Sequence, residues 1–439
     1  MNTMKYVGMF AGRCGQAMRG VLRRSRGLGT LGVLASAMVG AAGASLRAAD
    51  DVLAFRVGKV VTMDSKDTVV NNAVVIVRGG KIESVHRARE AKIPADARTI
   101  EMDECWLVPG LIDCHNHTGG SLRDLNDMVY LTNPGLRTLD TVVPESDDVK
   151  RARMGGVTSA LLIPGSGTNM SGFGTIVKFA GDTVDEMVMK SPGSLKIAQA
   201  GNPERYWYGV GRSMMNYNTR QTLQRALDYH RAWEAYEKGQ TTQKPEYNPI
   251  FEDFRGLFRQ EYIASMHTQI YQVVMTSIDM MARKFKVRTV LDHSTFDGWK
   301  NARNVLDVGE DMVKTICGPR AFFLDSTQRR MNGIAARWHQ GGVKQIGINT
   351  DAPVIPEEEL PYQAAMNCWF GFQPYLALKA VTSVPASALM IEKRVGSIEP
   401  GKDADFGVWT GDPIDPRSQC KITVINGKIV SDGREGQRW

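Results

Sequence analysis

The chain has 439 residues, 43% of them hydrophobic, so it is long enough to bury a large core and to hold more than one domain. Its formal net charge of +7 first suggests a nucleic-acid or membrane partner. Residues 1–49, however, contain seven basic residues and no acid, which leaves 47 basic and 47 acidic residues in the remainder. The surplus of positive charge therefore lies entirely in residues 1–49, and no nucleic-acid partner is expected.

Residues 1–49 have the layout of a secretory signal peptide. A basic stretch through Arg26 precedes an apolar run of small residues, and Ala42-Gly43-Ala44 or Leu46-Arg47-Ala48 fits a cleavage site. The Arg23-Arg24 pair leaves twin-arginine export open beside the general secretory route. Because a membrane span needs ~20 apolar residues, we expect export to the periplasm or the medium, with no stable membrane insertion after cleavage.

Segments 50–108 and 386–439 predict one small β-sandwich domain built from both ends of the chain. The turn Gly79-Gly80 and the turn Asn426-Gly427 are each followed by Lys-Ile, and both are typical of β-hairpins. Neither segment is large enough to fold comfortably alone, so we expect the middle of the chain to be inserted between them. The strands expected here are Val52–Val61, Val69–Val77, Lys81–Val85, Thr99–Leu107, Phe406–Trp409 and Ile422–Ile425.

Residues 109–385 predict an α/β domain, a (β/α)8 TIM barrel, whose usual length is ~250 residues. Apolar strands are expected at Val157–Ile163, Ile263–Met266, Thr289–Leu291 and Gln345–Ile348, and a helix at Leu376–Met390. Residues 206–260 interrupt this alternation with a polar, aromatic segment, which predicts a helical insertion.

The motif His115-Asn116-His117 ends an apolar run that is expected to form the first barrel strand. Residues i and i+2 of a strand point to the same face, so the two imidazoles can bind one metal ion. An exposed turn would place the same motif in solvent, and only downstream partners can decide between the two interpretations. Cys114 points to the opposite face, which predicts a packing residue.

Three further polar residues end apolar strands, where barrel enzymes hold their active-site residues. They are His267, His293 and Asp351; His267 follows His117 by 150 residues, His293 follows His267 by 26, and Asp351 follows His293 by 58. A barrel unit is about 31 residues long, so these intervals place the residues on strands 5, 6 and 8, with the first motif on strand 1. The remaining histidines outside the leader are expected to have no role in the site: His86, His230 and His339.

Five cysteines lie beyond the leader, and none forms a Cys-x-x-Cys pair. An odd number without that spacing does not indicate a disulfide framework, although a single bridge stays open.

Three segments resemble the amidohydrolase superfamily, specifically its imidazolonepropionase-like and prolidase-like metal hydrolases. Val108–His117 is similar to the strand-1 motif, Thr350–Val354 to the strand-8 aspartate, and Val395–Asp405 to the return to the β-domain. The resemblance implies that one or two divalent ions, with zinc expected, are bound by His115, His117, His267, His293 and Asp351. It also implies a strand-4 lysine as a bridging ligand, for which Lys196 is the first candidate and Lys178 the second.

The resemblance further implies hydrolysis of a C–N bond in an amide, cyclic amide or dipeptide-like small molecule by a metal-activated hydroxide. Asp351 would be the general base, and in a one-metal site His293 would instead orient the hydroxide or stabilise the oxyanion. A deaminase of the same superfamily and a non-catalytic exported binding protein are the alternatives. Basic residues near 205–220 fit either a carboxylate site or a solvated helix face, and a homo-oligomer is compatible with the sequence.

Overall fold

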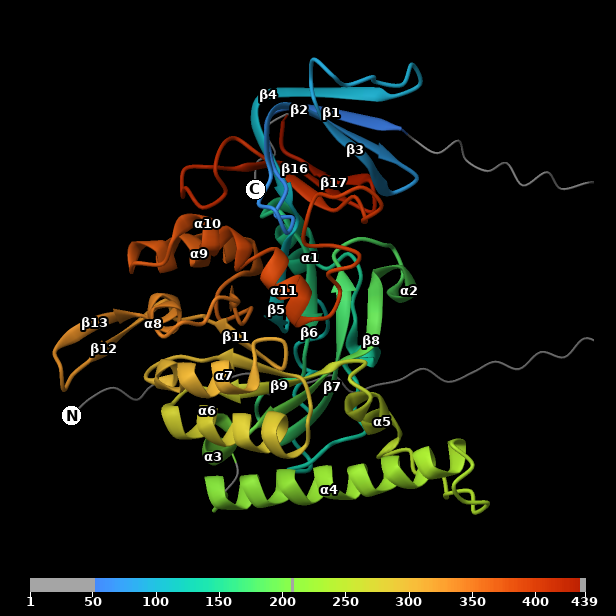
Figure 1. Cartoon of the computed structure of the whole chain (residues 1–439), viewed down its shortest axis with the longest axis vertical. Helices are drawn as coiled ribbons and strands as arrows, with labels where there is room; N and C mark the ends of the chain where they lie inside the picture. The colour runs from blue at the N-terminus through green and yellow to red at the C-terminus, as the bar shows by residue number, and fades with distance from the viewer. Residues whose placement is uncertain (1–51, 207–208, 435–439) are drawn as a thin grey trace, which may run out of the picture. The chain divides into compact units, whose positions relative to one another are not determined.

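The computed structural model describes residues 52–206 and 209–434, so the predicted leader lies outside the described residues. Within this part, two large β-sheets carry the fold, and helices cover one of them (Figure 1). In the described segments no helix is both long and apolar enough to span a membrane.

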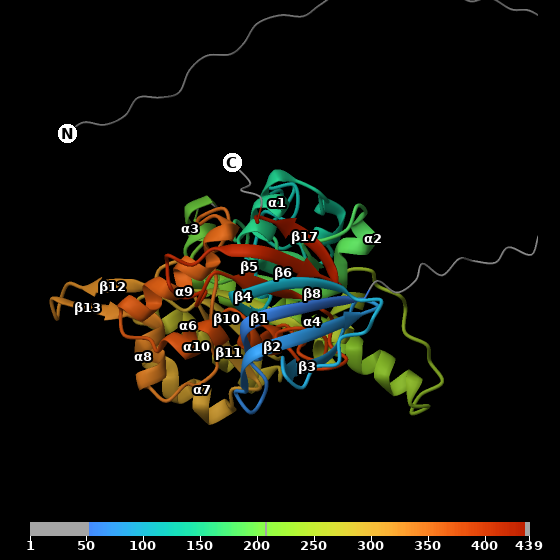
Figure 2. The same ribbon diagram turned by 90° about the horizontal axis from the view of Figure 1, so that it is seen from above.

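Both ends of the chain contribute to a single seven-stranded sheet, as the sequence predicts. Strand β15 pairs antiparallel with β4, which joins the C-terminal strands to the N-terminal ones (Figure 2). Phe55 and Phe406 meet edge to face in its core, with ring centroids 5.0 Å apart. The strands, in the order in which they lie in the sheet, are β17 (Lys428–Asp432), β16 (Cys420–Ile425), β15 (Phe406–Trp409), β4 (Arg98–Pro109), β1 (Leu53–Val61), β2 (Val69–Arg78) and β3 (Lys81–Arg87).

The two glycine-containing hairpin turns lie against each other. Gly80 and Gly427 have φ angles of +77° and +73°, a left-handed conformation that glycine adopts without steric cost. A Cβ added to Gly427 would stand only 2.7 Å from Gly80 Cα. Glycine at position 427 therefore allows both the turn and this close contact between the two halves of the sheet.

We expect Gly427→Ala to lower the free energy of unfolding by about 1–3 kcal/mol more than Gly239→Ala does. Gly239 has a similar φ of +68° but nothing within 4 Å of the added Cβ, so both variants share the backbone penalty. Urea titration of the two variants isolates the steric contact. Equal losses would mean that the turns can separate at no cost.

The second sheet is an eight-stranded barrel that closes where β14 meets β5. His117 N donates to Ala352 O at 2.9 Å, and Asn116 bridges Ala352 just beyond the end of β14. The strands in order are β5 (Leu111–Asn116), β6 (Val157–Leu162), β7 (Met170–Lys178), β8 (Val188–Ala198), β9 (Ile263–Thr268), β10 (Thr289–His293), β11 (Val313–Cys317) and β14 (Ile346–Ile348). The predicted barrel with a separate terminal sheet is confirmed.

One barrel strand differs from the repeating strand–helix pattern. Strand β7 runs antiparallel to both β6 and β8, whereas the other neighbouring strands pair in parallel. The reason is connection length, because a parallel crossover needs a dozen or more residues. The connections 163–169 and 179–187 are shorter and therefore form hairpins, the second containing only the short helix α2 (Val184–Met187).

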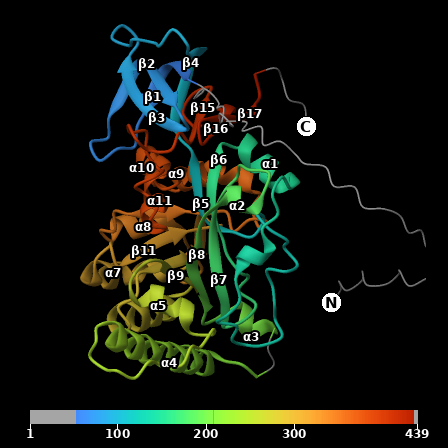
Figure 3. The ribbon, with the colours of Figure 1, turned by 90° about the vertical axis from the view of Figure 1, so that its right-hand side faces the viewer.

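Helices flank the barrel, and the predicted insertion 206–260 contains two of them. Helix α4 (Arg212–Glu237) packs Leu223 and Ala226 against a cluster that includes Phe254 of α5 (Glu252–Phe258), and it lies beyond the end of β7 and β8 (Figure 3). Further helices are α1 (Asp147–Met154), α3 (Asn202–Tyr206), α6 (Tyr271–Ser277), α7 (Ala302–Val308), α8 (Ile334–Gln340) and α9 (Leu360–Trp369). A hairpin of β12 (Phe322–Asp325) and β13 (Arg330–Gly333) extends from the barrel (Figure 1).

The single helix predicted over Leu376–Met390 is wrong. The structure has two shorter helices there, α10 (Pro374–Lys379) and α11 (Ser383–Ala388). Thr382, between them, has the non-helical angles φ −133° and ψ −88°. Pro385 lacks the N–H that a helix interior requires and is tolerated only in a first turn, which is where it stands in α11.

Candidate metal centre

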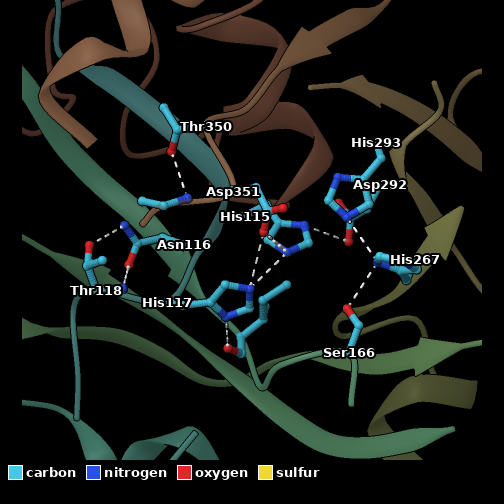
Figure 4. A network of polar contacts seen from close by, with 12 residues as sticks. His115, Asn116, His117, Thr118, Ser166, His267, Asp292, His293, Thr350 and Asp351 are labelled. Carbon is cyan, nitrogen blue, oxygen red and sulfur yellow. Dashed lines mark hydrogen bonds and ion pairs between the residues drawn. The ribbon is translucent and has the colours of Figure 1, made fainter. Parts of the chain in front are cut away.

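The histidine pair at the end of β5 converges on one point. His115 Nε2 lies 3.2 Å from His117 Nε2, and Asp351 Oδ1 lies 3.2 Å from the first and 3.4 Å from the second (Figure 4). His117 Nδ1 lies 2.8 Å from the carbonyl oxygen of Ile163. Donation of the Nδ1 proton to that carbonyl leaves the Nε2 lone pair directed at the cluster, as a ligand requires.

A second pair of imidazoles lies beside the first. His293 Nε2 faces His267 Nδ1 at 3.0 Å, and the ring centroids of His115 and His293 are 4.6 Å apart. His293 Nδ1 stands 2.9 Å from Gly318 O, which again orients Nε2 toward the other rings. Ser166 Oγ lies 3.0 Å from His267 Nδ1. The structure thus brings all four histidines and Asp351 together from four strand ends.

Lys196 of β8 reaches the same cluster from the strand beside β9. Its ammonium is fully buried, 3.4 Å from His115 Nε2 and 3.5 Å from Asp292 Oδ2. Burial lowers the pKa of Lys196 although the charges of Asp292 and Asp351 oppose that shift. A lysine whose charged form is destabilised in this way is suited to chemistry that needs its neutral amine.

Lys178, the alternative strand-4 candidate, is not brought to this site. It lies on β7, where its Nζ contacts Asp403 Oδ2 and Asp405 Oδ2, both at 2.8 Å, and Asn426 Oδ1 at 2.5 Å. These partners belong to the terminal sheet or the segment leading into it, so Lys178 links that sheet to the barrel.

Asp292 is a site residue that sequence reasoning misses. Its Oδ2 accepts a hydrogen bond from Ser265 and lies 3.4 Å from His115 Nδ1. Burial raises its pKa, but His115 and Lys196 outweigh burial and hold the pKa far below the usual range, so the group is ionised. Strand alternation would send Asp292 and His293 to opposite faces. His293 instead has φ +66°, which turns the chain and brings both side chains into the site.

Left-handed backbone recurs at the site. Besides His293, Asp351 has φ +54°, a conformation that costs non-glycine residues about 1–3 kcal/mol. Strain of this kind persists where the surrounding structure enforces it and is concentrated at functional sites.

Asp113 holds the backbone of His115 and Thr350 in place beside the metal centre. Its carboxylate accepts hydrogen bonds from His115 N at 2.8 Å and from Thr350 N and Oγ1 at 2.9 and 2.6 Å, which connects β5 to the end of β14. Burial raises the pKa of Asp113 to about 6 against the opposing effect of these donors. The sequence does not indicate this role, because the strand motif contains Asp113 but not the partners that it contacts.

We expect Thr350→Val to lower the free energy of unfolding by about 1–3 kcal/mol, because the buried Asp113 carboxyl loses a donor. Thr315→Val is the matched control, since the Thr315 hydroxyl is buried without a hydrogen-bond partner in the described part of the chain. That control is expected to be neutral or stabilising. Urea denaturation of both variants tests the difference, and equal stabilities would exclude this role for Thr350.

The three histidines that were expected to have no role in the site lie away from the cluster. His86 is on β3, His230 on α4 and His339 on α8. Cys114 is buried among apolar side chains, as expected for a packing residue.

The donor set fits a divalent cation. His115, His117 and Asp351 offer ligand atoms that all lie within 4.8 Å of one another. His267 Nε2 is buried and has no hydrogen-bond partner among the residues that the structure describes. Gly201 stands in front of this nitrogen, and a Cβ there would come within 3.6 Å of it. Imidazole nitrogens and a carboxylate are the ligands that zinc and similar ions prefer.

A cavity of about 580 Å³ opens onto the cluster, within the range of small-molecule sites. Its wall includes His267, His293 and Asp351, while the other lining residues are Gly201, Asn202, Arg205, Gln269, Thr295, Phe296, Gly318, Pro319, Arg320 and Val354.

Comparison with known proteins identifies relatives of this chain by sequence and by fold. Residues 303–432 match the Amidohydrolase family. The structure aligns with that of an amidohydrolase from Thermotoga maritima MSB8 at 28% identity and a TM-score of 0.76, covering 87% of this chain and 100% of that one. The C-terminal third of the chain thus matches the Amidohydrolase family, and the fold as a whole is similar to that of an amidohydrolase.

Two sequence relatives extend the match over most of the chain. Imidazolonepropionase of Pseudomonas aeruginosa (strain UCBPP-PA14) is 24% identical, over 78% of this chain and 89% of that protein. Amidohydrolase tasK of Hapsidospora irregularis is 25% identical over 77% of this chain, but the match spans only 38% of the length of that longer protein. The amidohydrolase relationship therefore extends well beyond the C-terminal third.

Proposed function

We propose that this protein is a metal-dependent amidohydrolase that cleaves a C–N bond in an amide, cyclic amide or dipeptide-like small molecule. The observation that carries the proposal is the convergence of four imidazoles and Asp351 beside a cavity of small-molecule size. Amidohydrolases and imidazolonepropionases among the relatives support C–N hydrolysis. Zinc is the ion that we propose, because the set is dominated by imidazole.

A bound divalent cation supplies a Lewis acid and makes water ionisable near neutral pH. His115, His117 and His267 would hold it, with Asp351 as the carboxylate ligand and Lys196 as a further ligand if two ions are present. Asp351 is also placed to take a proton from the attacking water and return it to the leaving nitrogen. Burial raises the pKa of Asp351, but His115 and His293 outweigh burial and keep it ionised.

His293 fits a ligand better than a donor to an oxyanion. Burial lowers its pKa to about 4, so the ring is neutral at pH 7. With the Nδ1 proton donated to Gly318 O, Nε2 carries a lone pair rather than a hydrogen.

The proposal is tested by metal analysis and a substrate panel. Protein purified under metal-replete conditions should contain a divalent ion and release amines from dipeptides and N-acyl amino acids, or open cyclic amides. Ammonia release from amino-substituted heterocycles alone would indicate the deaminase instead. Absence of metal from the wild-type protein would contradict the proposal, and metal without any turnover would favour a binding protein.

We also propose export of this enzyme, on the basis of the basic and apolar leader in residues 1–49. N-terminal sequencing of protein recovered from the periplasm or the medium should find a mature chain that begins after Ala44 or Ala48. Recovery of the full-length chain in the cytoplasm would exclude export.

A further inference from the structure

Two arginines line the cavity beside the metal centre and come from separate parts of the barrel. Arg205 belongs to α3, which follows β8, and Arg320 belongs to the loop after β11. Asp351, a member of the metal centre, is the only acid in the described cavity lining. The outer part of this cavity is therefore positively charged.

Neither guanidinium has a carboxylate partner among the residues that the structure describes, since none lies within ion-pairing distance of Arg205 or Arg320. Arg320 lies over the Phe296 ring, 5.7 Å from its centroid, and Phe296 is itself part of the cavity wall. A guanidinium placed on an aromatic face keeps its N–H groups free for an anion.

The arginines of α4, the helix that follows α3, do not line the cavity. Arg212 at the start of α4 lies 3.4 Å from Glu204, and Arg220 lies further along α4, outside the cavity. Of the basic residues in 205–220, Arg205 therefore lines the cavity, whereas Arg212 and Arg220 lie on the surface of α4.

We propose that the substrate carries a carboxylate, which Arg320 and Arg205 bind while the scissile C–N bond lies at the metal centre. This inference rests on the proposed function, whose substrate class it narrows. The planar guanidinium matches a carboxylate with two parallel hydrogen bonds, which a neutral amide cannot accept in the same way. Asn202, Gln269 and Thr295 add neutral polar groups to the same wall.

The experiment compares N-acetyl-L-leucine and Leu-Pro with the same compounds carrying a C-terminal amide. The wild-type enzyme should hydrolyse the acids with a kcat/KM at least tenfold above that of the amides. Arg320→Met and Arg205→Met should lower this acid-to-amide ratio by about 10- to 100-fold, mainly through KM. Arg320→Lys keeps the charge but not the paired donors, so its acid-to-amide ratio should lie between those of the wild type and Arg320→Met.

Arg330→Met and Arg220→Met are the matched controls, because these arginines are exposed and lie outside the cavity. Both should keep the wild-type ratio. Hydrolysis of acids and amides at equal rates, or an equal effect of all four Met variants, would overturn the inference while leaving the proposed function intact.

Calorimetry with N-acetyl-L-leucine separates the inference from turnover. Binding that is lost in Arg320→Met but kept in Arg330→Met supports the carboxylate site even if the protein hydrolyses none of the compounds. Binding that is the same in both variants contradicts it.

Discussion

Replacing Asp351 by Asn is expected to lower kcat/KM for amide hydrolysis by about 10²- to 10⁴-fold. Asn keeps the shape of the side chain but removes the carboxylate that stands 3.2 Å from His115 Nε2 and 3.4 Å from His117 Nε2. It can neither accept the proton of the attacking water nor provide a negative charge for a cation. The metal content per chain, measured by mass spectrometry, should fall together with the rate.

Asp307→Asn is the control for this substitution, because Asp307 is an exposed acid on α7. It should keep both the wild-type rate and the wild-type metal content. If Asp351→Asn kept metal and lost only rate, Asp351 would act in proton transfer without being needed to hold the ion. An unchanged rate would remove Asp351 from the chemistry altogether.

The strand-end histidines are the part of the site that sequence reasoning locates best. Strand alternation makes His115 and His117 share a face, and whole-unit spacing puts His267, His293 and Asp351 at the ends of the fifth, sixth and eighth strands. The structure places them on β9, on β10 and just after β14, which are those strands in the barrel order. Local periodicity and a regular repeat suffice for these positions.

Asp292 and the orientation of β7 could not be found in the same way. Asp292 shares a face with its register partner His267, and His293 reaches the site beside Asp292 only because His293 adopts a left-handed φ, which no periodic pattern indicates. The strand after β6 could be expected from its apolar residues, but its direction depends on connections that are too short for a crossover. Both features arise from backbone geometry rather than from residue type.

The sequence also could not decide which of the two candidate lysines lies at the metal centre. Lys178 and Lys196 lie on β7 and β8, the two strands of one hairpin, and both side chains are almost fully buried. Only the tertiary fold separates them, because the carboxylates that surround Lys178 come from residues 403 and 405, more than 220 positions away. Substitution of each lysine should therefore have a different consequence.

Replacing Lys178 by Met is expected to lower the free energy of unfolding by about 3–5 kcal/mol, because it leaves buried charge uncompensated. Asp403 keeps its contacts with Lys81 and Arg394. Asp405 keeps a hydrogen bond from Asn426 N but no cation in the described part of the chain. Urea unfolding measures the loss, and Lys150→Met, at a side chain that is 53% exposed, provides the control.

The loss should depend on pH and on Asp405. Burial already raises the pKa of Asp405 although Lys178 opposes it, so without Lys178 the ionised carboxylate is disfavoured still more in the folded state. A folded pKa above the unfolded value favours folding at low pH and loses that effect as pH rises. The penalty should therefore be smaller at pH 5 than at pH 8, and Lys178→Met/Asp405→Asn should recover part of it.

Metal content distinguishes this structural lysine from the one at the site. Lys178→Met should retain the wild-type amount of divalent ion under conditions where it is folded, because its side chain points into the ion-pair cluster with the terminal sheet. Lys196→Met should lose metal when two ions are bound, because it removes the proposed further ligand, 3.4 Å from His115 Nε2. Loss of metal in Lys178→Met with retention in Lys196→Met would reverse the two roles.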